Sequence, residues 1–566
     1  KEINIDGDGV NEIDFDLKFT TVEGKTVVVT AQARGQMDAI NKQLKAKSIK
    51  NIVSSDRIQE LPESNAAEAV ARIPGVSIRR EGGEGNKVVI RGLSPKYNKI
   101  TVNGTSLAST DPDNRSTDIS MISQYMLEGI EVTKAGTPDL DGDVLGGTVN
   151  FILKKAKPGL HGNSIAQGIY NGLEKEAGDY KYVASIGNRF LNDKLGVLAQ
   201  LDIENRNRSS HNLGAIYDNA PANLDSINSL KLLNMSLTDI NRNNDRSNNL
   251  FVVDYNIPRG NISYTGLNSK IDKSEINYSD IFAIPAEDRF YNTGQGENDI
   301  NVISETWKYE QKLLNNLSLD AFSSFSMSKN DSVNYRFQFE EQDAYTESVL
   351  KKSVENIQNF TKNNTNAAYW LGANYRENKT TEKESSFGMN LEYDFNLFNK
   401  ISGKIKTGFK SRNKRRDHDQ NQERLVWHSD INGYSGLRDT TINHFEWLSA
   451  IVDDSYGTQK IKYPVLRDDN YDLSNFLGGK YDIGPAADID KLQSIYQFAR
   501  NNPIFYNASY HENRMLKYHR TNSLIYDCIH EIDLMLFLFG KIRNIFCKNL
   551  KLIGKINSFD YSEILF

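Results

Sequence analysis

"FGMNLEYDFNLFNKISGKIKTGFK", residues 387–410, places an apolar or small side chain at every second position on either side of a short polar turn. The first half alternates over 387–395 and the second over 401–409. A period of two residues is typical of a β-strand with one apolar face. The stretch therefore predicts two long antiparallel strands joined by a tight turn.

The same alternation recurs at 180–190, at 195–203 and at 317–327, whereas 209–248 and 331–384 resemble long polar connections. Long strands with one apolar face, short turns at one end and long polar loops at the other are typical of an outer-membrane barrel. The 27 Tyr and 25 Phe residues suit its aromatic belts. A soluble antiparallel sheet also alternates, so a soluble β-rich binding protein stays open as an alternative.

Composition narrows the class of protein. The 566 residues are 38% apolar and 25% charged with a net charge of -6, so we expect folded material and no nucleic-acid partner. The densest apolar run, "LMLFLF" at 534–539, is far shorter than the ~20 residues of a spanning helix. The eight histidines have no paired spacing, so no metal site or cofactor is expected.

Residues 37–158 have a mixed α and β pattern. Ala and Val recur on helical spacing over 66–73, and Pro74 with Gly75 ends that helix. Strands are predicted at 76–79, 87–91 and 99–102, with Asn103-Gly104 as a tight reversal, and "GIEVTKAG" and "GGTVNFILKKA" bracket an acidic loop. We predict a compact domain of about 120 residues, a normal size.

Two short segments precede this domain. Residues 1–24 hold two short strands around "DGDG" and predict the end of a small β module. Residues 25–36, "KTVVVTAQARGQ", are extended and β-branched, with no hairpin partner nearby. Such a strand can add to a sheet edge of another protein, although an internal strand of the preceding module is equally compatible.

Taken together, four motifs resemble a TonB-dependent outer-membrane receptor: "KTVVVTA" (25–31), "LPESNAAEAVARIPGVSIRR" (61–80), "VVIRGLSPKYNKITVNGTSLAS" (88–109), and "IEVTKAG" with "LGGTVNFILKKA". The resemblance covers residues 1 to about 510. It implies the end of a carboxypeptidase-regulatory-like module at 1–24, a TonB box segment at 25–36, a plug domain at 37–158 and the N-terminal part of a β-barrel at 159–512. The fold class is mainly β, an α+β plug followed by an incomplete transmembrane antiparallel β-barrel.

The resemblance also implies a function, which is energised uptake of a scarce ligand (siderophore, cobalamin or oligosaccharide) across the cell outer membrane, without enzymatic chemistry. Expected partners are a TonB-like periplasmic energy transducer, the ligand and outer-membrane lipid, with a surface lipoprotein as a further candidate. The implied TonB box residues are Thr26, Val27, Val28, Val29, Thr30 and Ala31.

Ligand contacts are predicted in loops at the plug apex. The candidates are Tyr97, Asn98, Asp111, Asp113 and Arg115. The 86–109 hairpin would belong to the plug sheet, with its turns facing outward toward the ligand. Arg91 is predicted to pair with a carboxylate on the barrel wall, since its guanidinium suits a buried bidentate contact.

The last residues do not fit this pattern. Residues 513–566 form a short α/β fragment that carries the chain's two cysteines and resembles the Gfo/Idh/MocA oxidoreductases around Asp527, His530 and Asp533. Without a Gly-x-Gly-x-x-Gly turn the fragment is expected to be inert, with an NAD(P)-dependent oxidoreductase fragment as the alternative. Eight to ten strand candidates between 159 and 510 fall below the ~22 that enclose a plug, so a truncated barrel is expected.

Overall fold

The computed structural model describes residues 39–41, 43–44, 49–59, 65–134, 144–218, 231–350, 352–397, 401–426, 452–453, 460–471, 474–501 and 515–521. The predicted β module at 1–24 and the TonB box segment at 25–36 lie outside the described residues. So do Asp527, His530 and Asp533 of the C-terminal fragment. Among the described residues, no helix is long and apolar enough to cross a membrane.

The predicted plug folds around two small sheets. One has the order β1-β6-β7-β4-β5, and the other pairs β2 with β3. The bounds are β1 Lys50–Ser54, α2 Ser55–Gln59, α3 Ala66–Ala71, β2 Val76–Glu81, β3 Glu84–Ile90, β4 Asn98–Val102, β5 Thr105–Ser106, β6 Leu127–Thr133 and β7 Gly147–Leu153. The predicted helix and the three predicted strands are confirmed.

The prediction that 86–109 forms one hairpin is wrong. Strand β3 pairs with β2, whereas β4 pairs with β5 and runs parallel to β7. The 3-10 turn at Pro95–Tyr97 separates β3 from β4 and carries the chain from one sheet to the other. Asn103 and Gly104 do form the predicted reversal, with φ of 49° and 83°, because a type I′ turn needs two left-handed residues.

This reversal faces the wall of the large sheet. The prediction that it faces outward toward the ligand is therefore wrong. The Lys308 ammonium donates to the Asn103 carbonyl, and the hydroxyls of Thr105 and Thr306 lie 2.9 Å apart. Lys308 lies six residues before the end of β14 at Leu314, where a short turn follows. The reversal therefore lies toward the end of the sheet where the strands are joined by short turns.

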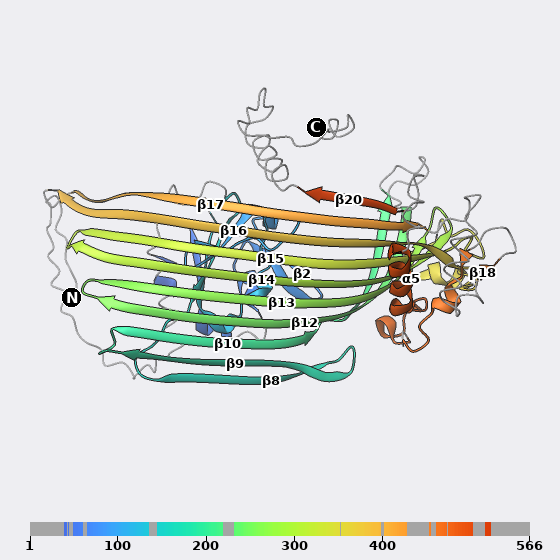
Figure 1. The fold of residues 1–566 in the computed structure, drawn as a ribbon, viewed down its shortest axis with the longest axis horizontal. Helices are drawn as coiled ribbons and strands as arrows, with labels where there is room; N and C mark the ends of the chain where they lie inside the picture. Colours follow the sequence, from blue (N-terminus) through green and yellow to red (C-terminus); the bar gives the residue numbers. More distant parts are fainter. Residues whose placement is uncertain are drawn as a thin grey trace, which may run out of the picture.

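The large sheet has eleven strands and lies in front of the plug in Figure 1. Its order is β20-β17-β16-β15-β14-β13-β12-β10-β9-β8, with β11 paired to β12. The bounds are β8 His161–Asn171, β9 Glu176–Phe190, β10 Leu195–Asn207, β11 Ser210–Asp218, β12 Lys231–Ile257, β13 Gly260–Ala283, β14 Asp288–Leu314, β15 Leu317–Glu341, β16 Tyr369–Leu397, β17 Ile401–Val426 and β20 Met515–Thr521. Among the described residues the sheet does not close, and β8 and β20 are its edges.

The long polar connections predicted at 209–248 and 331–384 are largely wrong, because strands β11, β12, β15 and β16 extend through much of them. Strand β16 has 29 residues, and its apolar and polar positions alternate near the short turn and again at the opposite end of the strand. Between these two parts, over 376–386, both faces of the strand are polar. The backbone ladder continues there, but the sequence period that reveals a strand is lost.

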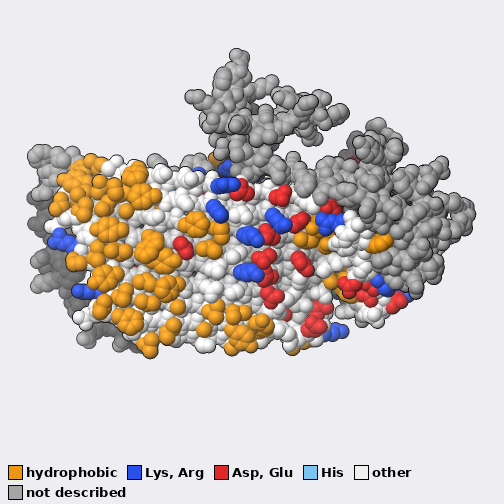
Figure 2. Space-filling view, viewed as in Figure 1, with side chains coloured by type: hydrophobic (Ala, Val, Ile, Leu, Met, Phe, Trp, Pro, Cys, Tyr) orange, Lys and Arg blue, Asp and Glu red, His pale blue; other side chains and the backbone are white. Residues whose placement is uncertain are grey.

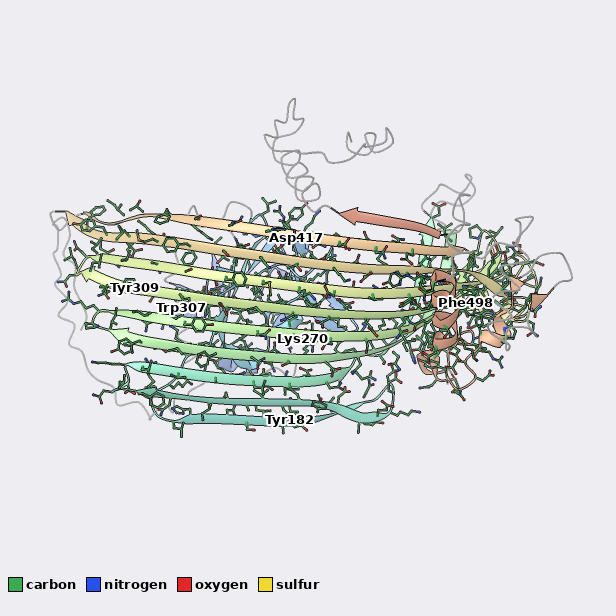
Figure 3. All side chains as sticks on the ribbon, in the orientation of Figure 1. Tyr182, Lys270, Trp307, Tyr309, Asp417 and Phe498 are labelled. Atoms are coloured by element: carbon green, nitrogen blue, oxygen red, sulfur yellow. The ribbon has the colours of Figure 1, made fainter. Side chains whose placement is uncertain are left out.

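The face turned away from the plug carries a broad apolar region near the short turns (Figure 2). Trp307, Phe387 and Phe409 are 56%, 47% and 52% exposed on it, and Trp307 and Tyr309 mark this end of the sheet in Figure 3. A soluble sandwich would bury such a face against a second sheet. An exposed apolar face of this extent suits contact with lipid, as the barrel prediction requires.

Lys and Arg mix with Asp and Glu beyond the apolar region, where Figure 3 labels Lys270 and Asp417. Still farther along, the same face is covered by residues 460–471 and 474–501, which we call the collar. The collar contains the short elements β19 Lys460–Ile461, η6 Tyr463–Leu466 and η7 Phe476–Gly478, and the helix α5 Ile489–Asn501. Figure 1 shows α5 crossing in front of the strands, on the side opposite the plug.

Candidate functional site

The contact between plug and wall centres on the carboxylate of Glu84, which is 4% exposed. Glu84 accepts from Arg246 on β12 and lies 3.3 Å from the Arg208 guanidinium. The Asn65 amide donates to the same carboxylate at 2.7 Å, while its oxygen caps helix α3 by accepting from the Ala67 amide at 2.9 Å. The local structure of the plug helix is thereby tied to the wall ion pair.

Burial alone would raise the pKa of Glu84, but the charges of Arg246 and Arg208 outweigh it and lower this pKa to about 2. Because the folded value lies below the ordinary 4.5, ionised Glu84 stabilises the plug above pH 4.5, and this contribution is lost as the pH falls toward 2.

We expect amide exchange of the plug, corrected for intrinsic rates, to accelerate between pH 4.5 and 2. Glu84→Gln should abolish that acid step, and an unchanged step in this variant would contradict the assignment.

A second group of contacts docks the plug segment 107–118 on strands β15 to β17. The Ala108 amide donates to Ser326 Oγ at 2.9 Å, and the Ser109 amide donates to Glu382 Oε1 at 2.7 Å. The Arg416 guanidinium donates to the carbonyls of Asn114 and Pro112 at 3.0 and 2.9 Å. Backbone groups of an irregular segment are therefore satisfied by side chains of the wall, as burial requires.

Part of the interface is apolar. One connected cluster of buried side chains contains the plug core and also Leu250, Leu267, Ile271 and Val302 of the wall. The plug is thus held by an apolar patch bordered by polar contacts. Polar contacts of this kind exchange for water at low net cost once the plug moves, whereas the apolar area resists separation.

Three predicted ligand residues lie in the docked segment. Asp113 is exposed, Arg115 is half-buried, and the Asp111 carboxylate pairs with Lys87 and accepts from Ser116 at 3.2 Å. Burial raises the pKa of Asp111, but the bond to Lys87 outweighs it and leaves this pKa below its usual value. The structure brings these three residues together, and their contact with a ligand stays a prediction.

The other two ligand candidates lie apart from that segment. Tyr97 ends a 3-10 turn and is half-buried. Asn98 begins β4 and is 9% exposed, and its amide donates to the Val88 carbonyl at 2.8 Å. Its predicted place in an apical loop is therefore wrong, because the chain has already entered the plug sheet at this position.

The predicted pairing of Arg91 with a wall carboxylate is also wrong within the described part of the chain. Arg91 is exposed, with a left-handed φ of 53°, and forms no ion pair with the described residues. The observed ion pair has the opposite arrangement of charges from the predicted one. The plug contributes the carboxylate of Glu84, and the wall contributes the guanidinium of Arg246.

Arg246, the wall residue of this ion pair, was not predicted, because strands were recognised by their alternating apolar residues. In "RNNDRSN", residues 242–248, the plug-facing positions are Arg242, Asn244, Arg246 and Asn248, all buried. Every residue of this segment is polar, so no two-residue period identifies its lumen face, and the strand register is needed to select these four positions. No cluster of potential metal ligands is found among the described residues.

Comparison with known proteins identifies the plug. Residues 42–148 match the family model of the TonB-dependent Receptor Plug Domain. The vitamin B12 transporter BtuB of Vibrio vulnificus (strain YJ016) is 27% identical over 129 residues, which are 22% of this chain and 20% of the transporter. The match therefore spans about a fifth of that relative's length.

Two solved receptor structures are also matched, at low identity. The ferric citrate transporter FecA in its unliganded form is 9% identical with a TM-score of 0.30, over 68% of this chain and 64% of FecA. The siderophore receptor PiuA from Acinetobacter baumannii is 12% identical with a TM-score of 0.28, over 67% and 64%. Residues 42–148 are thus similar to the plug domain of TonB-dependent receptors, and in this chain a large antiparallel sheet follows them.

Proposed function

We propose that the chain serves energised uptake of a scarce ligand, with the plug displaced from the wall by a periplasmic TonB-like transducer. Support comes from the plug contacts, where ion pairs and hydrogen bonds of Glu84 and the 107–118 segment border a limited apolar patch. Such contacts can break one at a time under force. Proteins of this family are receptors and transporters, and no reaction on the ligand is required.

The ligand would bind between the plug apex and the outer end of the sheet, with Tyr97, Asp111, Asp113 and Arg115 as candidate contacts. Cobalamin and siderophores are suggested by the names of the relatives, and oligosaccharides remain a further class. Outer-membrane lipid would cover the apolar face, and a surface lipoprotein is a further candidate partner. A working barrel would need strands beyond the eleven described, because lipid cannot satisfy the free edges at β8 and β20.

The TonB box tests this function directly. In a Cys528→Ser, Cys547→Ser background, Val28→Cys should form a disulfide in cells with a cysteine placed in the periplasmic domain of TonB, because residues 26–31 would pair with it as an added strand. Val22→Cys, just before the box, is the matched control. Capture that is equal at both positions, or absent at both, would contradict the proposed role of residues 25–36.

Fixing the plug to the wall should block transport. In the same background, Thr105→Cys with Thr306→Cys replaces two hydroxyls that lie 2.9 Å apart across the interface. Oxidation is expected to reduce uptake of cyanocobalamin or ferric citrate, whichever the parent chain takes up, to the level of cells without the receptor. Reductant should restore it, and Thr105→Cys alone should behave as the parent. Full uptake by the oxidised double variant would show that the plug does not need to move there.

A further inference from the structure

Two arginines face the lumen beyond the plug. On β15 the plug-facing positions are even-numbered, as the contacts of Ser326 and Asn330 with the plug show. On β16 the plug-facing positions are also even-numbered, as the contact of Glu382 with the Ser109 amide shows. The ladder between β15 and β16 is regular up to Gln338, so Arg336 and Arg376 project to the plug side.

The two guanidinium groups are close neighbours on this face. Arg336 lies directly opposite Asn374, and Arg376 directly opposite Asn334, which makes the arginines diagonal neighbours. Side chains in this relation start about 7–8 Å apart and can reach a common partner. Both arginines are exposed, and neither forms an ion pair or hydrogen bond with other residues in the described part of the chain.

Two carboxylates on the same face of the described sheet already have other partners. Glu275 is engaged by Arg242, whose Nε donates to it at 2.8 Å, and Glu340 accepts from the Tyr369 hydroxyl. Two like charges side by side on a sheet are unfavourable unless a counter-charge arrives. This contrasts with Arg246 and Arg289, which are each buried against a carboxylate.

The surroundings supply neutral hydrogen-bonding groups. Amide side chains on the same face flank the arginines, and the amides of Asn277 and Asn334 lie over Gly294 and Gly296 on β14, which pair with Arg336 and Asn334. The flanking amides are Asn334, Gln338, Asn374, Asn378 and Gln422. Arg336 lies six residues beyond Asn330, the wall residue that contacts the plug at Thr110, which is ~20 Å along the strand. The pair therefore borders the space between the plug apex and the outer end of the sheet.

We propose that Arg336 and Arg376 form a binding site for a small polyanion, whose carboxylate or phosphate oxygens accept from both guanidinium groups while the amides bind its hydroxyl or carbonyl groups. Arginine suits planar anions because its fork of donors gives bidentate contacts. The site deepens the proposed uptake function by giving the ligand's chemical class, and it rests on that function only for its role in transport.

Calorimetry on the detergent-purified full chain tests the site with three probes, namely citrate, pyrophosphate and the uncharged trimethyl ester of citrate. Citrate or pyrophosphate should bind, with affinity falling at least tenfold in Arg336→Ala or Arg376→Ala and beyond detection in the double variant. The tighter of the two anions identifies carboxylate or phosphate as the preferred group. The matched control is Lys379→Ala, which removes an exposed cation from the opposite face of the same strand.

Three results would overturn the site: no binding of either anion, equal binding of the trimethyl ester, or equal affinity in the double variant and the parent. Misfolding is checked by heat-modifiable migration of each variant. Binding in detergent needs no transducer, so it is separate from transport. The chain could bind an anion through the two arginines and yet form no disulfide with TonB. That result would contradict the uptake proposal but support the binding site.

Discussion

Replacing Glu84 with alanine is expected to loosen the plug from the wall by about 3 kcal/mol. Removing one partner of a buried ion pair costs about 3–5 kcal/mol, since the other charge is left without compensation. The lower end applies here because Arg246 keeps a second carboxylate, Glu204, at 3.6 Å. Hydrogen exchange in the plug, followed by mass spectrometry on the detergent-purified chain, should accelerate about a hundredfold.

The matched control for this change is Glu81→Ala in the same hairpin. The Glu81 side chain is 50% exposed, and Lys273, which lies 3.6 Å from it, keeps a closer contact with Asp118 at 3.0 Å, so the loss of Glu81 should alter exchange little. If both variants exchanged equally fast, the hairpin and not the buried ion pair would be the site of weakness. Exchange at the parent rate in Glu84→Ala would show that Arg246 is satisfied without the plug.

The sequence predicts those parts of the fold where local pattern and environment agree. Alternation at 387–410 marks two strands because one face meets an apolar medium, and Ala66 to Ile73 mark a helix because one side enters the plug core. The middle parts of the strands were missed, since polar side chains on both faces, as over 376–386 of β16, give no apolar period. Register alone extends β16 back to Tyr369.

The candidate site is less predictable for a different reason. Glu84 and Arg246 are 162 positions apart, and nothing local to either residue specifies the other. The same holds for Arg336 and Arg376, which become neighbours only through the pairing of β15 with β16. The sequence does contain the relevant residue types at the correct parity. Choosing among them requires the strand register, which turn geometry and the whole apolar pattern determine together.

Collar attachment depends on buried Arg289, and Arg289→Ala is expected to release the collar from the wall. Arg289 on β14 donates to Asp280 on β13 at 2.7 and 2.5 Å, and Asp280 accepts from the Gly484 amide of the collar at 2.9 Å. The guanidinium also lies over the rings of Phe282 and Tyr291, at 4.8 and 4.9 Å. Its loss leaves a carboxylate that is 1% exposed with one remaining donor from the collar, a cost of about 3–5 kcal/mol.

Limited proteolysis of the detergent-purified chain measures this release, with cleavage of Arg289→Ala expected first within the collar. Arg467→Ala is the matched control, because Arg467 pairs with Asp469 at the surface, where an ion pair contributes about 0–1 kcal/mol. The plug should keep its exchange protection in both variants, since Glu84 and the 107–118 segment contact the opposite face of the sheet. Cleavage of Arg289→Ala at the parent rate would mean that the aromatic contacts of Tyr463 and Tyr496 suffice to hold the collar. Loss of exchange protection in the plug of Arg289→Ala would show that the two faces of the wall are coupled.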